Sequence, residues 1–123
     1  MKLFIIIGAI NALLSVGLGA FGAHALEGRV EAKYLDTWNT AVQYQMFHAT
    51  GILIIGILMG TLPATGLLSW AGWLMLVGIL VFSGSLYVLS LSGISVLGAI
   101  TPIGGVAFLA AWICLIAAAV KGL

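Results

Sequence analysis

Polar side chains inside the apolar runs of this chain are the residues that could do chemistry. Tyr44 and His48 share one face of the second run, with Thr40 and Gly51, whereas Gln45 points away from that face. Polar groups are costly inside a bilayer, so each of them invites a functional hypothesis. Turned inward, they would form one polar seam, made of Asn11, His24, Tyr44, His48, Ser83 and Tyr87.

Two chemistries fit such a seam, and the residue types leave both open. The seam could bind a neutral or amphipathic small molecule. A functional role is best supported at His48, because a histidine within a span can also carry protons. Alternatively, the same groups could only hydrogen-bond the helices to one another, as Ser, Asn and His commonly do in membranes. For the serines we favour the packing interpretation.

Catalysis and metal binding are poorly supported by the apolar runs. They contain no Asp or Glu and only one cysteine, Cys114, whereas zinc needs three or four ligands. A serine or cysteine nucleophile would lack a carboxylate to orient its base, and an ion pump would lack a charged group within a span. We therefore predict no catalytic residues, no metal and no cofactor. A haem held by His24 and His48 is the less favoured alternative, because their expected depths differ.

The elements that position these groups are four apolar runs. The chain is 63% hydrophobic and 6% charged, whereas a soluble domain has about a quarter charged residues. A spanning helix needs about 20 apolar residues. We predict an all-α integral membrane four-helix bundle, formed by a single transmembrane domain over 1–123 with spans at about 3–26, 39–60, 67–91 and 101–120.

The connection 27–38 holds five of the seven charged residues. Apolar residues recur there every four positions, which predicts a short amphipathic helix lying at the headgroup level after the first span. That helix would be an interfacial elbow anchoring the hairpin, or a surface that docks a partner. The connection 61–66 contains Pro63 and Gly66, which favour a break between the second and third spans.

The first run could be mistaken for a secretory signal, since Ala23-His24-Ala25 resembles a cleavage site. We expect it to be retained, because its apolar stretch exceeds the 7 to 15 residues that are typical of a signal. Four spans put both termini on one side of the membrane. Lys2 precedes the first span, which favours cytoplasmic termini and a multi-pass location in the cell membrane.

Several stretches together resemble one known family. They are "LGAFGAHAL" (18–26), "WNTAVQYQMFHA" (38–49), "FSGSLY" (82–87) and "TPIGG" (101–105). Their order and content are similar to the membrane family called domain of unknown function 423, whose animal relatives are called transmembrane protein 256. The resemblance covers essentially the whole chain. It implies a four-span membrane protein and implies no reaction and no residue roles.

We therefore expect a small polytopic inner-membrane or plasma-membrane protein, non-enzymatic, whose seam binds a small molecule or specifies packing. The alternative is an accessory factor that presents residues 27–38 to another membrane complex. Membrane lipids are the expected partners, and a homo-oligomer or a membrane-protein partner is also compatible with the sequence. A net charge of +1 gives no reason to expect nucleic acid.

Overall fold

A computed structural model describes residues 1–63 and 65–122, and the regular structure within them is helical. Ala64, in the expected connection 61–66, and Leu123, at the end of the expected domain, lie outside the described residues. In chain order the elements are α1 (Lys2–Phe21), the π-helical turn η1 (Gly22–Leu26), α2 (Ala32–Leu58), α3 (Thr65–Gly78), the π-helical turn η2 (Ile79–Ser83), α4 (Gly84–Ser92), the 3₁₀ helix η3 (Ser95–Ala99) and α5 (Thr101–Gly122).

These elements join into four rods that are long and apolar enough to cross a membrane. Within the described ranges the rods are Lys2–Leu26, Ala32–Leu58, Gly66–Ser92 and Ser95–Gly122. Because backbone polar groups must be satisfied internally in lipid, unbroken helices are the expected solution for such sequences. The predicted all-α four-helix membrane bundle is therefore confirmed.

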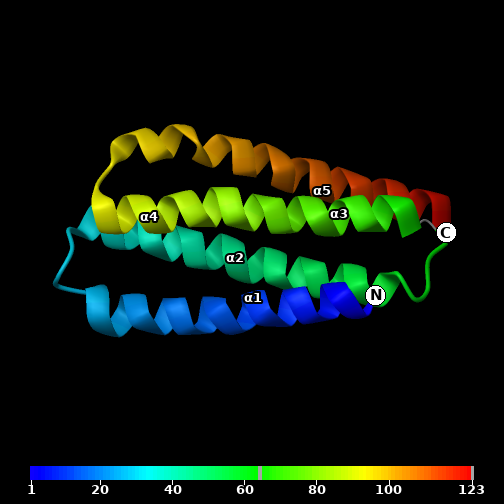
Figure 1. The fold of residues 1–123 in the computed structure, drawn as a ribbon, viewed down its shortest axis with the longest axis horizontal. Coiled ribbons are helices and arrows are strands. Elements are labelled where there is room, and N and C mark those ends of the chain that lie inside the picture. The colour runs from blue at the N-terminus through cyan, green and yellow to red at the C-terminus, as the bar shows by residue number, and fades with distance from the viewer. Residues whose placement is uncertain (64, 123) are drawn as a thin grey trace.

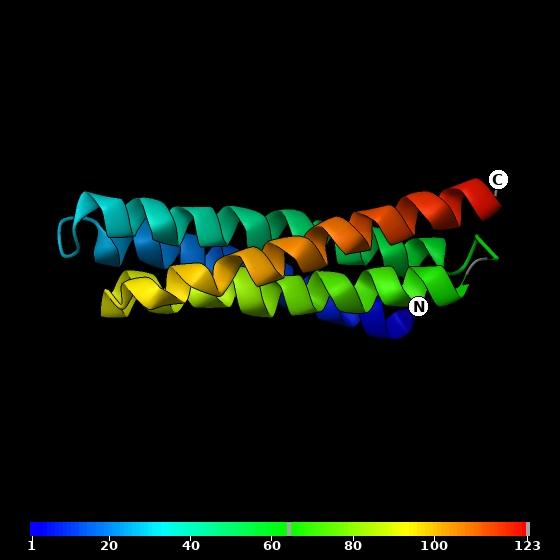
Figure 2. The same ribbon diagram turned by 90° about the horizontal axis from the view of Figure 1, so that it is seen from above.

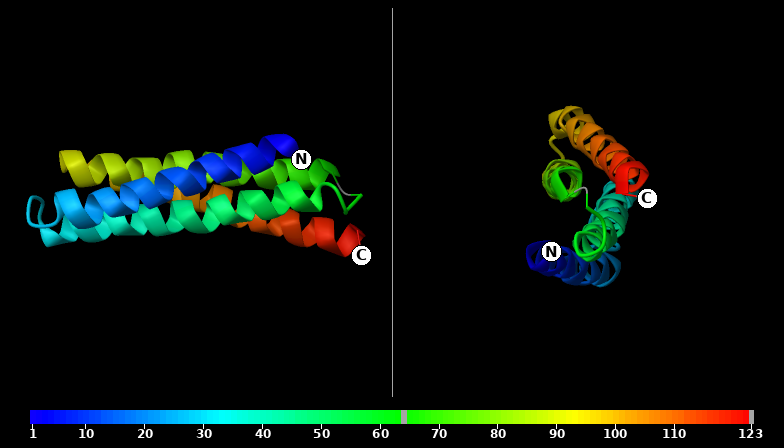
Figure 3. Two further views of the ribbon diagram at one scale, coloured as in Figure 1. Left: turned by 90° about the horizontal axis from the view of Figure 1, so that it is seen from below. Right: turned by 90° about the vertical axis from the view of Figure 1, so that its right-hand side faces the viewer.

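The rods are antiparallel, and the N-terminal end of α1 lies at the same end of the bundle as the C-terminal end of α5 (Figure 1). The helix α2 is central, because it packs against α1, α3 and α4. The helix α5 packs mainly on α3 and η2, and runs obliquely across the α3–α4 rod (Figure 2). Seen along the rods, α1 and α5 lie on opposite sides of the bundle (Figure 3).

The predicted separate helix over 27–38 is wrong. Residues 27–31 form a turn in which Gly28 has a positive φ of 81°, and α2 has already begun at Ala32. Most of the apolar residues that recur every four positions in the expected elbow lie in the first part of the long helix α2. Trp38 is 3% exposed and donates Nε1–H to the Leu18 carbonyl at 2.8 Å, so it packs inside the protein rather than on its surface.

The apolar core lies between α2, α3 and α5, and Phe4 enters it from α1. Two glycines allow α5 to approach the α3–α4 rod closely. A Cβ atom on Gly78 would collide with the Phe108 ring, and one on Gly104 would lie 2.8 Å from the Phe82 Cα atom. Small residues are typical of such contacts, since close backbone approach drives packing in lipid. These contacts fix Phe82 and Phe108 at the inner side of α5.

Candidate functional site

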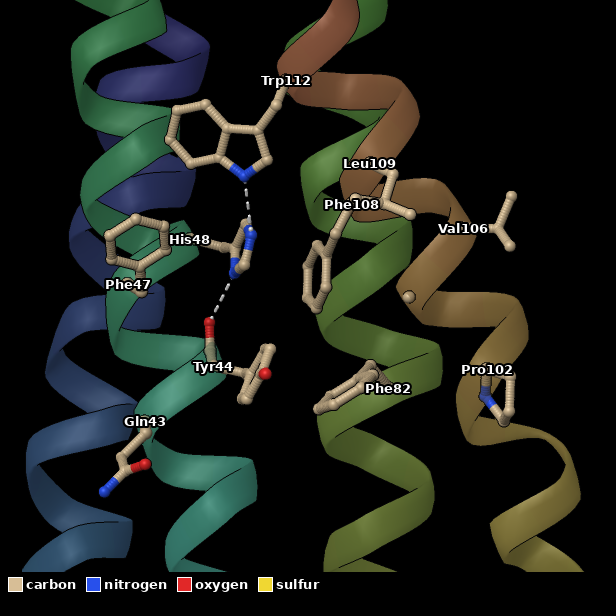
Figure 4. Close-up of a pocket in the computed structure, with 11 residues that line it drawn as sticks. Gln43, Tyr44, Phe47, His48, Phe82, Pro102, Val106, Phe108, Leu109 and Trp112 are labelled. Carbon is tan, nitrogen blue, oxygen red and sulfur yellow. Dashed lines mark hydrogen bonds between the residues drawn. The ribbon is translucent and has the colours of Figure 1, made fainter.

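His48 lies on α2 and uses both of its ring nitrogens. Trp112 on α5 donates its indole N–H to His48 Nε2 at 3.0 Å, and His48 Nδ1 lies 2.8 Å from the Tyr44 carbonyl oxygen (Figure 4). An indole nitrogen can only donate, so Nε2 is the acceptor. Nδ1 therefore carries the proton and donates it to Tyr44 O. This arrangement holds a neutral imidazole in one tautomer.

Aromatic rings surround this histidine. The His48 ring stacks on Phe108 with centroids 3.5 Å apart and planes 9° from parallel. Tyr44 contacts Phe82 with ring centroids 4.3 Å apart, and Phe82 contacts Phe108 at 5.5 Å. The rings come from α2, η2 and α5, so three separate elements build one aromatic wall.

This wall lines a groove between α2 and α5 with a volume of about 740 Å³ (Figure 4). That volume is in the range of small-molecule sites. Phe47, Val106 and Leu109 are more than 60% exposed at its rim, where the bilayer would surround the protein. The lining residues are Gln43, Tyr44, Phe47, His48, Phe82, Pro102, Gly105, Val106, Phe108, Leu109 and Trp112.

The groove lies along the apolar parts of two helices that are long enough to span a membrane. Asp36 and Lys121 are the nearest charged residues along the two helices, and no charged residue stands between them in the sequence. At 1.5 Å per residue, Tyr44 is about 12 Å along α2 from Asp36, and Trp112 is about 13 Å along α5 from Lys121.

A second polar cluster occupies a different face of α2. The Tyr87 hydroxyl donates to Gln45 Oε1 at 2.6 Å, and Gln45 Nε2 donates to Asn11 Oδ1 at 3.2 Å. Asn11 in turn donates its amide to the Ile7 carbonyl at 3.0 Å. This directed chain of hydrogen bonds joins α4, α2 and α1. We call it the Asn11–Gln45–Tyr87 chain.

The six residues of the expected seam are therefore divided. Asn11 and Tyr87 meet through Gln45, whereas Tyr44 and His48 line the groove. The remaining two belong to neither group: Ser83 donates to the Ala41 carbonyl at 2.8 Å, and His24 is exposed in η1.

Sequence reasoning missed Gln45, which it placed away from the polar face, and did not pair Trp112 with His48. The cost of a buried amide within a span was a signal that could have identified Gln45.

The two histidines do not converge on a common point. Gly22 packs against Trp38, so His24 lies beyond that level, towards the turn 27–31. His48 is about 15 Å further along α2 from Trp38, at 1.5 Å per residue. His48 Nε2 is also occupied by Trp112. This geometry does not fit a haem shared by the two imidazoles. Among the described residues, no cluster of three or more His, Cys, Asp or Glu could hold a metal ion.

Four apolar rods and the residues between them define a multi-pass helical membrane protein. The model of a family described as "Protein of unknown function (DUF423)" matches residues 18–105, and the chain belongs to this family.

It is similar to the UPF0382 membrane protein YwdK of Bacillus subtilis, with 60% identity over 98% of each chain. It is also similar to the UPF0382 membrane proteins SAB0533 of Staphylococcus aureus, at 55%, and SH2409 of Staphylococcus haemolyticus, at 54%, again over 98% of each chain. No solved structure matches the chain.

Proposed function

We propose that this protein binds a neutral, lipid-soluble small molecule in the groove between α2 and α5, without transforming it chemically. The observation that carries the proposal is an aromatic groove of about 740 Å³ on the spanning part of the helices. Aromatic walls offer a large apolar contact area and preferred stacking geometries. A charged molecule would meet no countercharge among the lining residues, and burying an unpaired charge is expensive.

The division of the seam supports assigning different roles to its parts. The hydrogen bonds of the Asn11–Gln45–Tyr87 chain are all made within the protein, which suits a role in helix packing. The groove residues leave a concave surface instead. Ligand binding is therefore assigned to Tyr44, Phe82 and Phe108, with His48 as a fixed wall.

We further propose that the protein lies in the cell membrane with both termini in the cytoplasm. Lys2 and Lys121 stand at the end of the bundle that carries both chain ends (Figure 1). Positive residues next to spans favour the cytoplasmic side, and the first helix usually has the strongest influence. The similar bacterial proteins are also named membrane proteins.

Photolabelling of the protein in lipid nanodiscs tests the ligand-binding proposal. The probe is trifluoromethyl-phenyldiazirine, which is neutral and apolar and reacts with whatever surrounds it on illumination. Peptide mapping should find labelling at Tyr44 and Phe47 that excess trifluorotoluene competes away. Labelling on the lipid-facing side of α1, for example at Leu13, should not be competed.

A groove-filling variant makes the test specific. A Cβ atom on Gly105 would lie 3.9 Å from the Phe82 ring, so the longer side chain of Gly105→Leu can occupy the groove. This variant should lose the competable labelling. Gly17→Leu is the matched control, because a Cβ atom on Gly17 has no neighbour within 4 Å. Labelling at Tyr44 that is never competed, or that survives in Gly105→Leu, would reject the proposal.

A further inference from the structure

The Tyr44 hydroxyl differs from the other polar groups of the groove. His48 uses both ring nitrogens, and the Trp112 N–H is taken by His48. The Gln43 amide points away from Phe82 (Figure 4). Within the part of the chain that the structure describes, the Tyr44 hydroxyl has no hydrogen-bond partner, and the residue, which lines the groove, is 42% exposed.

An unpaired hydroxyl at this depth calls for a partner from outside the protein. Tyr44 lies about 12 Å along α2 from Asp36, where lipid tails offer no hydrogen-bond acceptor. A hydroxyl that leaves water without gaining a hydrogen bond is destabilised. A groove ligand with an acceptor oxygen would remove that cost, whereas a plain hydrocarbon would not.

The surrounding rings constrain the shape of such a ligand. The planes of Tyr44 and His48 are 14° from parallel, and those of Tyr44 and Phe108 are 23° from parallel, in both cases with centroids 6.2 Å apart. His48 and Phe108 already stack on each other at 3.5 Å, so the offset position beside Tyr44, whose plane is nearly parallel to theirs, is where a further flat ring would stack. A flat ring fits this position better than a flexible acyl chain does.

From these observations we infer that the groove takes a neutral planar ring carrying a carbonyl oxygen, which accepts a hydrogen bond from the Tyr44 hydroxyl. This inference rests on the proposed function. It assigns the chemical class of the ligand and makes Tyr44 the residue that determines specificity.

Two competitors of the photoprobe that differ in one group provide the test. Acetylnaphthalene has the ring and the carbonyl, and ethylnaphthalene has nearly the same shape without the oxygen. The wild-type protein should bind acetylnaphthalene about fivefold more tightly, the ratio given by a net hydrogen bond of about 1 kcal/mol. Tyr44→Phe should weaken acetylnaphthalene about fivefold and leave ethylnaphthalene unchanged.

Tyr34→Phe is the matched control, since Tyr34 lies near Gly93, away from the groove, and both competitors should keep their wild-type affinities. The infrared carbonyl stretch of bound acetylnaphthalene provides a second readout. It should lie at lower frequency in the wild-type protein than in Tyr44→Phe.

Each failure identifies which proposal is wrong. Equal affinities of the two competitors for the wild-type protein would overturn the hydrogen bond to Tyr44 while leaving the groove as a binding site. The same holds if Tyr44→Phe weakens both competitors equally, because Tyr44 would then contribute ring contact alone. If the probe gives no competable labelling in the wild-type protein, the proposed function falls, and this inference falls with it.

Discussion

At the scale of single residues, buried polar groups are satisfied in two ways: Ser15 and Ser90 bond carbonyls of their own helices, whereas others find partners on neighbouring helices. Gln45 shows the second way: it is 4% exposed, accepts from Tyr87 and donates to Asn11. The sequence predicted that polar side chains would meet and correctly placed Gln45 off the face of Tyr44 and His48, but it left Gln45 out of the polar seam. Periodicity tells which residues share a face of one helix, and it does not tell which neighbouring helix covers that face.

Gln45→Leu should destabilise the bundle, because it leaves the Tyr87 hydroxyl and the Asn11 Oδ1 atom without their partners. Hydrogen bonds between membrane helices contribute about 0.6 to 1.7 kcal/mol each, so the free energy of unfolding should fall by about 1–3 kcal/mol. Unfolding in SDS from mixed micelles, followed by circular dichroism, measures this change. Thr50→Val is the control, since Thr50 is exposed and bonds only within its own helix, to the Met46 carbonyl. Equal losses in the two variants would show that the interhelical bonds contribute nothing.

At the scale of the elements, the π-helical turn η2 positions the groove. It spans Ile79–Ser83 between α3 and α4, and π-helical turns are often found at functional sites. From this turn Phe82 reaches the groove, and Ser83 bonds the Ala41 carbonyl of α2. The sequence predicted one uninterrupted helix over 67–91, because a π-helical turn inside an apolar run leaves no mark on hydropathy.

Gly104→Ala should separate α5 from η2, because the added Cβ atom would lie 2.8 Å from the Phe82 Cα atom, where backbone cannot easily move aside. Overpacking of this kind costs about 1–3 kcal/mol, which the same SDS unfolding measures. Gly84→Ala has open space around its Cβ atom and should be neutral or stabilising by up to about 1 kcal/mol. If Gly104→Ala is as stable as Gly84→Ala, the close approach of α5 to η2 is not a real constraint on the fold.

At the scale of the whole molecule, hydropathy predicted the rods well and their arrangement poorly. Four apolar runs were sufficient to expect four antiparallel spans. However, Ile52 and Ile55 are fully buried while Val106 and Leu109 are about two-thirds exposed, although all four are apolar. Lipid tails are as apolar as these side chains, so hydrophobicity cannot tell a core face from a lipid face. The open groove between α2 and α5 was therefore not predictable from composition.

The orientation of the whole bundle is tested with single cysteines in a Cys114→Ala background. Glu31→Cys lies in the turn between α1 and α2, and Thr61→Cys lies just after α2, at the end of the bundle that carries the chain ends. With cytoplasmic termini, a membrane-impermeant maleimide should label Glu31→Cys in intact cells and Thr61→Cys only after permeabilisation. The reverse pattern would refute that orientation.

Equal labelling of both cysteines would mean that the chain inserts in both orientations. The distribution of positive charge is compatible with such a mixture. Lys2 and Lys121 face one side of the membrane, and Arg29 and Lys33 face the other, so Lys/Arg counts alone do not decide. Arg29→Ala removes that tie. In this variant the labelled fraction of Glu31→Cys in intact cells should stay the same or rise, because the remaining bias favours cytoplasmic termini. A fall would show that flanking positive charge does not set the orientation of this bundle.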